Sequence, residues 1–327
     1  MNNVYTIVAR AHAMHYDNKI LKLAGPLRRE PDMGNMLKGK VAVITGAGNG
    51  LGRAHAIEMA AQGASVVVND LGTSWDGRGV SSEAADIVVQ TIRRAGGAAI
   101  ANYDSVALET GAEAIIKTAL EQYGRIDILV NNAGIIRNQP LDKIQTEDFD
   151  AVVKTHLYGT MFCTRAACRS MKKQKYGRII STSSHIGFGF PAQATYSAVK
   201  ESIVGFCRSV ARELGSDGIT CNVIRPIAAW RGIPPEHALP AIEALRPEDI
   251  SALVIYLASE QADHINGCIF EVFRGRVGIF VDPPPLQQIL WKDGSWTPEE
   301  LGQVIPKTLT KGRSREVYPP TLPDLFD

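Results

Sequence analysis

The fold of this chain is decided by residues 40–52, which read KVAVITGAGNGLG and lead into RAHAIEMAAQ at 53–62. The run up to Thr45 is short, apolar and rich in β-branched residues, which predicts a buried parallel strand. Strand, glycine turn and helix in this order favour a phosphate-binding loop, because glycines let the backbone approach a pyrophosphate and a helix N-terminus offers free N–H groups. A tight turn that binds nothing is the alternative interpretation of the glycines.

The next predicted strand ends in an acid. Residues 65–70 read SVVVND, so Asp70 stands at its tip. A carboxylate there can accept hydrogen bonds from ribose hydroxyls and would repel a 2′-phosphate. No arginine follows Asp70 directly and Asn49 is not basic, so the sequence favours NAD over NADP. The alternative is that Asp70 only caps the following turn.

From Lys38 onward, apolar runs and helical patterns alternate. This alternation predicts an α/β fold: a Rossmann-like, doubly wound parallel sheet of seven strands in a single domain. The predicted strands are 40–45, 65–70, 98–103, 126–130, 177–184, 219–224 and 268–273. The predicted helices are about 53–62, 82–94, 109–123, 147–171, 196–214 and 297–304.

We divide the chain into an N-terminal extension (1–37), a nucleotide-binding and catalytic domain (38–275) and a C-terminal extension (276–327). The first segment has no continuous apolar stretch, which argues against a secretory signal. A transit-like segment, an arm packed on the surface and an over-long start remain open for it.

The composition excludes several classes of protein. With 327 residues and 45% hydrophobic residues, the chain can bury a large core. A formal net charge of +1 gives no electrostatic footprint for nucleic acid or an anionic membrane, and no apolar run reaches the ~18 residues of a membrane span. The 5 cysteines lack Cys-x-x-Cys spacing, so we expect a reducing compartment and neither disulfides nor a metal site.

Tyr196 and Lys200 lie four residues apart in YSAVK at 196–200, and therefore on one face of a helix. A cation beside the phenol favours the phenolate and lowers the tyrosine pKa from about 10 toward neutrality. An ordinary helix is the alternative for this pair taken alone.

Other polar residues follow the ends of predicted strands. NNAG at 131–134 and the pair Ser183 and Ser184 share the sheet edge of the glycine loop. We therefore expect these groups, the phenol and the ammonium to converge on one cleft. Turn-forming serines and a backbone-bridging Asn132 are the alternatives for each residue alone.

Three motifs together resemble those of the short-chain dehydrogenases/reductases: TGxxxGxG at 45–52, NNAG at 131–134 and YxxxK at 196–200. The resemblance covers roughly 38–275 and implies an NAD-dependent oxidoreductase that interconverts a secondary alcohol and a ketone. It implies Tyr196 as acid/base, and Lys200 as the residue that lowers its pKa and holds the nicotinamide ribose. The implied cofactor contacts are Gly46, Asn49, Gly50, Leu51, Gly52, Asp70, Asp104, Asn132, Ala133, Gly134, Tyr196 and Lys200.

The implied catalytic set is Ser184, Tyr196, Lys200 and His156, with three points of difficulty. Strand register favours Ser184 as the hydroxyl that binds the substrate oxygen, whereas the family's usual spacing favours Ser183. Most of the family has asparagine in place of His156, so this histidine is either a proton relay or a satisfied helix residue. The usual Pro-Gly after the sixth strand is replaced by Pro226-Ile227.

A narrower resemblance is to the dehydrogenase unit of the peroxisomal multifunctional enzymes of type 2, carried by VVNDLG at 67–72, HLYG at 156–159 and QKYGRII at 174–180. It implies a (3R)-hydroxyacyl-CoA as substrate, with a steroid or other lipophilic alcohol as the alternative. A non-catalytic NAD-binding subunit on the same scaffold is the rival from another class. We expect an apolar wall from Ile186, Phe188, Phe190, Ile227 and Trp230, and candidate phosphate ligands for CoA in Arg137, Arg231 and Arg274.

The resemblance also implies a homodimer or homotetramer, formed through the helices at about 147–171 and 194–214. The chain ends in Asp327 and not in Ser-Lys-Leu, so we expect a cytoplasmic enzyme. Its partners would be small-molecule substrates, not nucleic acid or membranes.

Overall fold

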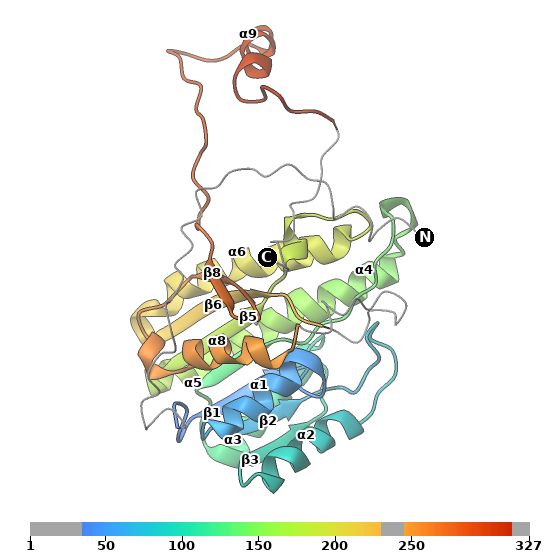
Figure 1. Cartoon of the computed structure of the whole chain (residues 1–327), viewed down its shortest axis with the longest axis vertical. Helices are drawn as coiled ribbons and strands as arrows, with labels where there is room; N and C mark the ends of the chain where they lie inside the picture. The colour runs from blue at the N-terminus through green and yellow to red at the C-terminus, as the bar shows by residue number, and fades with distance from the viewer. Residues whose placement is uncertain (1–34, 230–244, 316–327) are drawn as a thin grey trace.

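The structure is a computed structural model that describes residues 35–229 and 245–315. Its centre is one twisted sheet with helices on both faces (Figure 1). The strand order is β3-β2-β1-β4-β5-β6-β7-β8. The strands are β1 (Val41–Thr45), β2 (Ser65–Asn69), β3 (Ala98–Asn102), β4 (Ile128–Asn131), β5 (Gly177–Thr182), β6 (Ile219–Pro226), β7 (Ile269–Phe273) and β8 (Arg276–Ile279).

The predicted doubly wound α/β fold is confirmed, with one difference in the sheet. Strands β1 to β7 are parallel, whereas β8 pairs antiparallel with β7. The described sheet therefore has eight strands, not the seven predicted. Strand β8 has no buried residue, so its sequence lacks the apolar run from which a strand is recognised.

Two helical layers cover the sheet. On one face lie α1 (Gly50–Ala61), α2 (Glu83–Arg94) and α8 (Glu248–Ala258). On the other face lie α3 (Glu109–Tyr123), α5 (Gly159–Gln174) and α6 (Ala194–Leu214), with α4 (Thr146–Val153) leading into α5. Helix α8 is not among the predicted helices, because its seven residues from Ala252 to Ala258 are all apolar and the helix shows little contrast between its faces.

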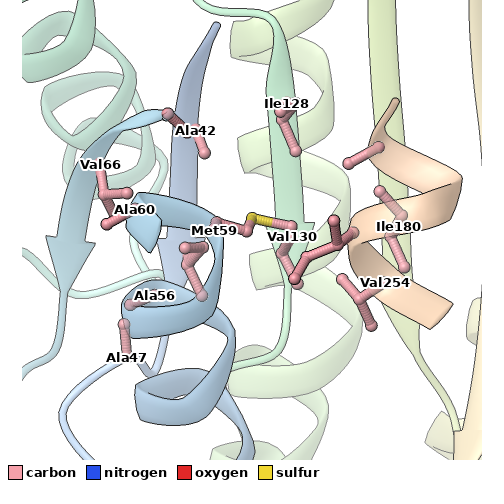
Figure 2. Packing of buried hydrophobic residues seen from close by; sticks show 14 of the residues in the cluster. Ala42, Ala47, Ala56, Met59, Ala60, Val66, Ile128, Val130, Ile180 and Val254 are labelled. Carbon is pink, nitrogen blue, oxygen red and sulfur yellow. The ribbon is translucent and has the colours of Figure 1, made fainter. Parts of the chain in front are cut away.

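The larger core lies between the sheet and the layer formed by α1, α2 and α8. Met59 of α1 reaches over the sheet toward Val130 of β4, and Val254 of α8 packs beside them (Figure 2). All three side chains are fully buried, and each such burial contributes about 1.5–3 kcal/mol relative to exposure. This packing fixes α1, and with it the glycine turn that precedes α1.

Residues just outside both limits of the predicted domain pack with it. Leu37 is fully buried and belongs to the core, and β8 belongs to the sheet. The division into extensions and domain stays a prediction, and residues 1–34 lie outside the described residues. Beyond β8, the chain runs away from the sheet to α9 (Pro298–Val304), which confirms the helix expected there (Figure 1). No helix in the two described segments is long and apolar enough to cross a bilayer.

His55 of α1 is buried without full hydrogen bonding. Its Nδ1 lies 2.9 Å from the Ser251 Oγ of α8, and its Nε2 has no hydrogen-bond partner among the described residues. Burial lowers the pKa of His55 to about 3. The unfolded chain therefore binds a proton at His55 between about pH 6.5 and 3 that the folded protein does not, and stability falls as the pH drops through this window.

We predict that His55→Gln removes about 2 kcal/mol of the loss in unfolding free energy between neutral pH and pH ~5. Glutamine is polar enough to meet Ser251 but does not titrate. Urea unfolding at both pH values measures the difference. The exposed His264 offers a matched control, because His264→Gln should leave the pH dependence unchanged. An unaltered acid loss in His55→Gln would contradict the assignment.

Candidate active site

A cleft of about 700 Å³ opens at the carboxyl ends of the parallel strands. It is bounded by the glycine loop, the tip of β2, the loop after β4, the end of β5 and the start of α6. The predicted site residues that line it are Gly46, Asn49, Gly50, Leu51, Asp70, Asp104, Asn132, Ala133, Gly134, His156, Ser184, Tyr196 and Lys200. The expected convergence of these groups on one cleft is therefore observed.

Gly52 does not line the cleft, and its role is in packing. A Cβ at this position would overlap the Gly46 carbonyl oxygen and lie 2.6 Å from the Asn132 side-chain nitrogen. Gly46 itself has φ +64°, and a Cβ there would lie 2.8 Å from the Ala133 Cα. The first turn of α1 can therefore rest against β1 and β4 only while positions 46 and 52 have no side chain.

The N-terminus of α1 fits the diphosphate of a dinucleotide. Gly50 has φ +50° and open space where a side chain would be, and it faces the cleft. The preceding Asn49 makes no side-chain capping bond, and the first turn contains no acid. The positive end of the helix is therefore left to an anion from outside the chain.

Asn132 joins two strand ends. Its Nδ2 donates to the carbonyl oxygens of Thr45 (3.0 Å) and Gly46 (3.1 Å). The Thr45 Oγ1 in turn accepts from the backbone N–H groups of Asn132 and Ala133. Asn132 therefore bridges backbone groups in this structure, which is the alternative role given to it in the sequence analysis.

Asp70 both caps the turn after β2 and faces the cleft, as the two interpretations of it in the sequence expected. Its two carboxylate oxygens accept from the backbone N–H groups of Gly48 and Gly72, each at 2.7 Å, so it does hold the following turn. It also lines the cleft. Asp104, further along the same edge, is exposed and accepts from the Asn102 amide at 2.8 Å.

Ser184 and Ser183 point in different directions. Both serines border the cleft. The Ser184 hydroxyl interacts with the Tyr196 phenol, and the Ser184 Oγ accepts from the Ile186 N–H at 3.1 Å. Ser183 is buried, and its Oγ donates to the Lys200 carbonyl oxygen at 2.7 Å. The hydroxyl that lies with the phenol is therefore that of Ser184.

Burial dominates the charge states of the central pair. The phenol end of Tyr196 is enclosed, and this raises its pKa to about 12, against the opposing effect of the Ser184 hydrogen bond. Burial likewise lowers the pKa of Lys200 to about 7. The Lys200 Nζ donates to the Thr182 carbonyl oxygen at 2.8 Å and lies 5.4 Å from the centroid of the Tyr196 ring. The expected lowering of the Tyr196 pKa by Lys200 is not found in this structure.

His156 is buried beside the phenol. Its ring meets that of Tyr196 edge-on, with centroids 5.4 Å apart. Its Nε2 lies within hydrogen-bond distance of both the N–H and the carbonyl oxygen of Ile135, whereas its Nδ1 has no partner among the described residues. Burial, and secondarily the charge of Lys200, lower its pKa to about 3, so the ring is neutral. A Cβ on Gly134 would lie 2.5 Å from this ring, which explains the glycine.

A π-helical turn places His156. The helix predicted over 147–171 is interrupted by the π segment Lys154–Tyr158 between α4 and α5. Such turns insert an extra residue and occur frequently at functional sites. Periodicity does not reveal this one, because α4 and α5 each keep a regular pattern.

The expected apolar wall is present in part. Ile186 and Ile227 line the cleft, together with Ala228 and Ala229. Phe188 does not, because its ring packs against Arg225 and Phe280. Trp230 and Arg231 lie outside the described residues. Of the proposed phosphate ligands, Arg137 is already bound to Asp148 and to the Asp76 carbonyl oxygen, and Arg274 lies exposed in the turn after β7.

The sequence model of the short chain dehydrogenase family matches residues 40–229. The chain belongs to this family. The resemblance noted in the sequence is thus confirmed, and this short-chain dehydrogenase is an oxidoreductase acting on CH–OH groups. Members of the family use NAD or NADP.

The short-chain dehydrogenase is similar to several named relatives and to a solved structure. It is 48% identical to "Peroxisomal multifunctional enzyme type 2" of Mus musculus over 78% of this chain and 33% of the mouse protein. It is 38% identical to "Hydroxyacyl-CoA dehydrogenase ChsB1" of Mycobacterium tuberculosis, over 81% of this chain and 87% of that protein. A crystal structure of a short chain dehydrogenase from Mycobacterium avium superposes with a TM-score of 0.76 and 38% identity, covering 86% of this chain and 98% of the other. The chain thus spans about a third of the length of the mouse relative.

Sequence reasoning missed one rim of the cleft. Thr73, Trp75 and Gly77, in the loop after β2, line it, and the Trp75 carbonyl oxygen accepts from the Ile136 N–H at 3.2 Å. The signal was available, because the polar, glycine-rich stretch 72–79 directly follows Asp70 at the ligand-binding edge of the sheet.

We predict that Ser184→Ala lowers kcat by roughly 10²–10³-fold, because the hydroxyl beside the phenol is lost. Ser183→Ala should change kcat less than about threefold and cost about 1 kcal/mol of stability, since it removes a buried hydrogen bond to α6. Steady-state kinetics and urea unfolding of both variants measure these effects. A larger kinetic loss in Ser183→Ala than in Ser184→Ala would reverse the assignment.

Proposed function

We propose that this short-chain dehydrogenase oxidises 3-hydroxyacyl-CoA thioesters to 3-oxoacyl-CoA with NAD, and runs the reverse reaction. The observation that carries the proposal is the group of Tyr196, Ser184 and Lys200 at one end of a cleft whose other parts fit a dinucleotide. The neutral His156 packed against the phenol supports the same interpretation.

In the proposed reaction, Tyr196 exchanges a proton with the substrate oxygen. A bound NAD would supply the acceptor for the hydride of the carbinol carbon. Tyr196 as phenolate takes the alcohol proton during oxidation, and as phenol it returns the proton to the ketone during reduction. Ser184 donates a hydrogen bond to the substrate oxygen and so fixes it against the phenol. A pKa of about 12 keeps the Tyr196 phenol protonated in the free protein. Oxidation requires the phenolate, and the role proposed for Lys200 is to favour the phenolate through the positive charge of its protonated form.

The substrate class is supported by the wall of the cleft and by relatives. Ile186, Ile227 and their alanine neighbours offer an apolar surface for an acyl chain. The relatives from mouse and M. tuberculosis bear the names of a multifunctional enzyme and a hydroxyacyl-CoA dehydrogenase. Steroid or other lipophilic alcohols are the alternative substrates, and a subunit that binds NAD without catalysis is the remaining rival.

Assembly and location are also proposals. We propose a homodimer or homotetramer through α5 and α6 and their flanking segments, where Tyr158 and Phe149 expose aromatic rings. A cytoplasmic location stays a prediction, since several relatives are named as peroxisomal.

The substrate class can be tested with a panel of (3R)- and (3S)-hydroxyacyl-CoAs and steroid alcohols. We predict that the protein turns over one of the two hydroxyacyl-CoA series with a kcat/KM at least about tenfold above that for any steroid. Nicotinamide absorbance in the presence of NAD measures it. A higher kcat/KM for a steroid supports the alternative alcohol. Tight NAD binding without turnover of any substrate supports the non-catalytic subunit.

We predict that Asp70→Asn weakens the preference for NAD over NADP by at least about tenfold, because a negative charge facing the 2′ position is lost. The ratio of kcat/KM for the two cofactors measures it. Asp76→Asn is the matched control, since Asp76 carries the same charge in the next loop but does not line the cleft. An unchanged ratio in Asp70→Asn would argue against NAD selection by Asp70.

A further inference from the structure

A network of polar and charged side chains surrounds the loop that begins at Ser184, and of its members only His185 also lines the cleft in the described part of the chain. Its members come from four elements: His185 follows Ser184, Glu201 is on α6, Arg225 on β6, and Glu271 on β7. None of these positions belongs to a motif from which the function was inferred. Arg225 and Glu271 stand out because both are buried within the sheet, at 2% and 7% exposure.

Arg225 contacts the Ser184 loop directly. Its Nη1 donates to the Ser184 carbonyl oxygen at 2.8 Å, and its Nη2 donates to Glu201 at 2.7 Å. The guanidinium stacks on Phe188, with its Cζ 4.2 Å from the ring centroid. A Cβ on Gly187 would lie 2.9 Å from Arg225 Nη1 and 3.0 Å from Glu201 Oε2, so a side chain at position 187 would push this pair out of its present position.

A second contact holds the same loop. His185 Nε2 lies 2.5 Å from Glu271 Oε2, and Arg276 of β8 lies 3.1 Å from the other oxygen of Glu271. Phe280, directly after β8, packs on both His185 and Phe188, with centroids 5.9 and 5.6 Å apart. The short helical segment His185–Phe188 is therefore held from β6, β7 and β8 at once.

Burying a guanidinium costs free energy unless its charge is paired and its N–H groups are hydrogen-bonded. A buried ion pair is often no more stabilising than apolar residues of the same volume, and the Arg225 Nε has no hydrogen-bond partner in the described part of the chain. Stability alone therefore does not explain why an arginine, and not an apolar residue, occupies this position. Its two donors instead connect the carbonyl of Ser184 to α6, the helix that carries Tyr196.

We propose that Arg225 is a positioning residue that fixes the Ser184 hydroxyl against Tyr196. It holds the Ser184 backbone from one side, while the Ile186 N–H holds the Ser184 Oγ from the other. The serine thus needs no rearrangement when a substrate oxygen arrives, which is the condition for efficient orientation. The proposal rests on the proposed role of Ser184 in hydride transfer.

The test is a double-mutant cycle between Arg225→Met and Ser184→Ala. Arg225→Met should lower kcat about 10- to 100-fold in the otherwise unchanged protein, with KM for the cofactor changed less than twofold. In the Ser184→Ala background it should lower kcat less than about twofold, because Arg225 acts through that serine. A kcat within twofold of the parent, or equal losses in both backgrounds, would overturn the proposal.

Hydrogen exchange separates this proposal from the proposed function. The Ile186 and Gly187 N–H groups bond Ser184, so peptides covering 184–189 should exchange at least about fivefold faster in Arg225→Met without any substrate present. Arg125→Met is the matched control, since it removes an arginine–carboxylate pair with Asp127 just before β4, at the opposite edge of the sheet from this loop. Failure of the proposed function would appear as no turnover by the parent protein, with the exchange result still readable.

Glu201→Gln provides a second variant should Arg225→Met fail to fold. The Glu201 side chain is 46% exposed, so its replacement spares the core while it loosens Arg225. We expect kcat to fall about three- to tenfold in the parent protein and to stay unchanged in the Ser184→Ala background. Equal losses in the two backgrounds would overturn the proposal here too.

Discussion

The cleft depends on the hydrogen bonds that join the ends of β1 and β4. These two strands are neighbours in the sheet, but the chain forms β2 and β3 on one side before it returns to β4, so ligands are expected at this point. Asn132 and Thr45 close the gap between the strand ends with reciprocal side-chain to backbone bonds. They leave room for α1 to approach only because Gly46 and Gly52 lack side chains. The glycine loop, α1 and the floor of the cleft are all positioned relative to this connection.

The chemistry of the site follows from what burial does to three titratable groups. It raises the pKa of Tyr196 to about 12, lowers that of Lys200 to about 7 and keeps His156 neutral. Each group is thus shifted toward its uncharged form, as expected where charges are poorly solvated. A site in this state gives up a proton to a ketone more readily than it takes one from an alcohol. Any charge that enters the cleft will act on these groups with little screening.

Sequence reasoning performed best where chemistry restricts the residue types. Gly46, Gly50 and Gly52, the acid at Asp70 and the spacing of Tyr196 and Lys200 each follow from a steric or electrostatic requirement, and the structure brings their elements to one cleft. It performed less well where tertiary packing decides. The residues of strand β8 are mostly exposed, α8 is apolar throughout its last seven residues, and Phe188 packs on Arg225 instead of lining the cleft. Strand register, by contrast, favours Ser184 over Ser183, and the Ser184 hydroxyl is the one that lies with the phenol.

The π-helical turn at Lys154–Tyr158 links the position of His156 in the site to the packing of α5. One additional residue in a helix rotates everything beyond it by about 100° about the axis. The face that α5 presents to α3 and the sheet is therefore set in phase by the same turn that directs His156 toward Tyr196. Deleting one residue from this turn would restore a regular helix and yet misalign the whole of α5 with its neighbours. The number of residues in this turn is fixed by the packing of the next four turns of helix.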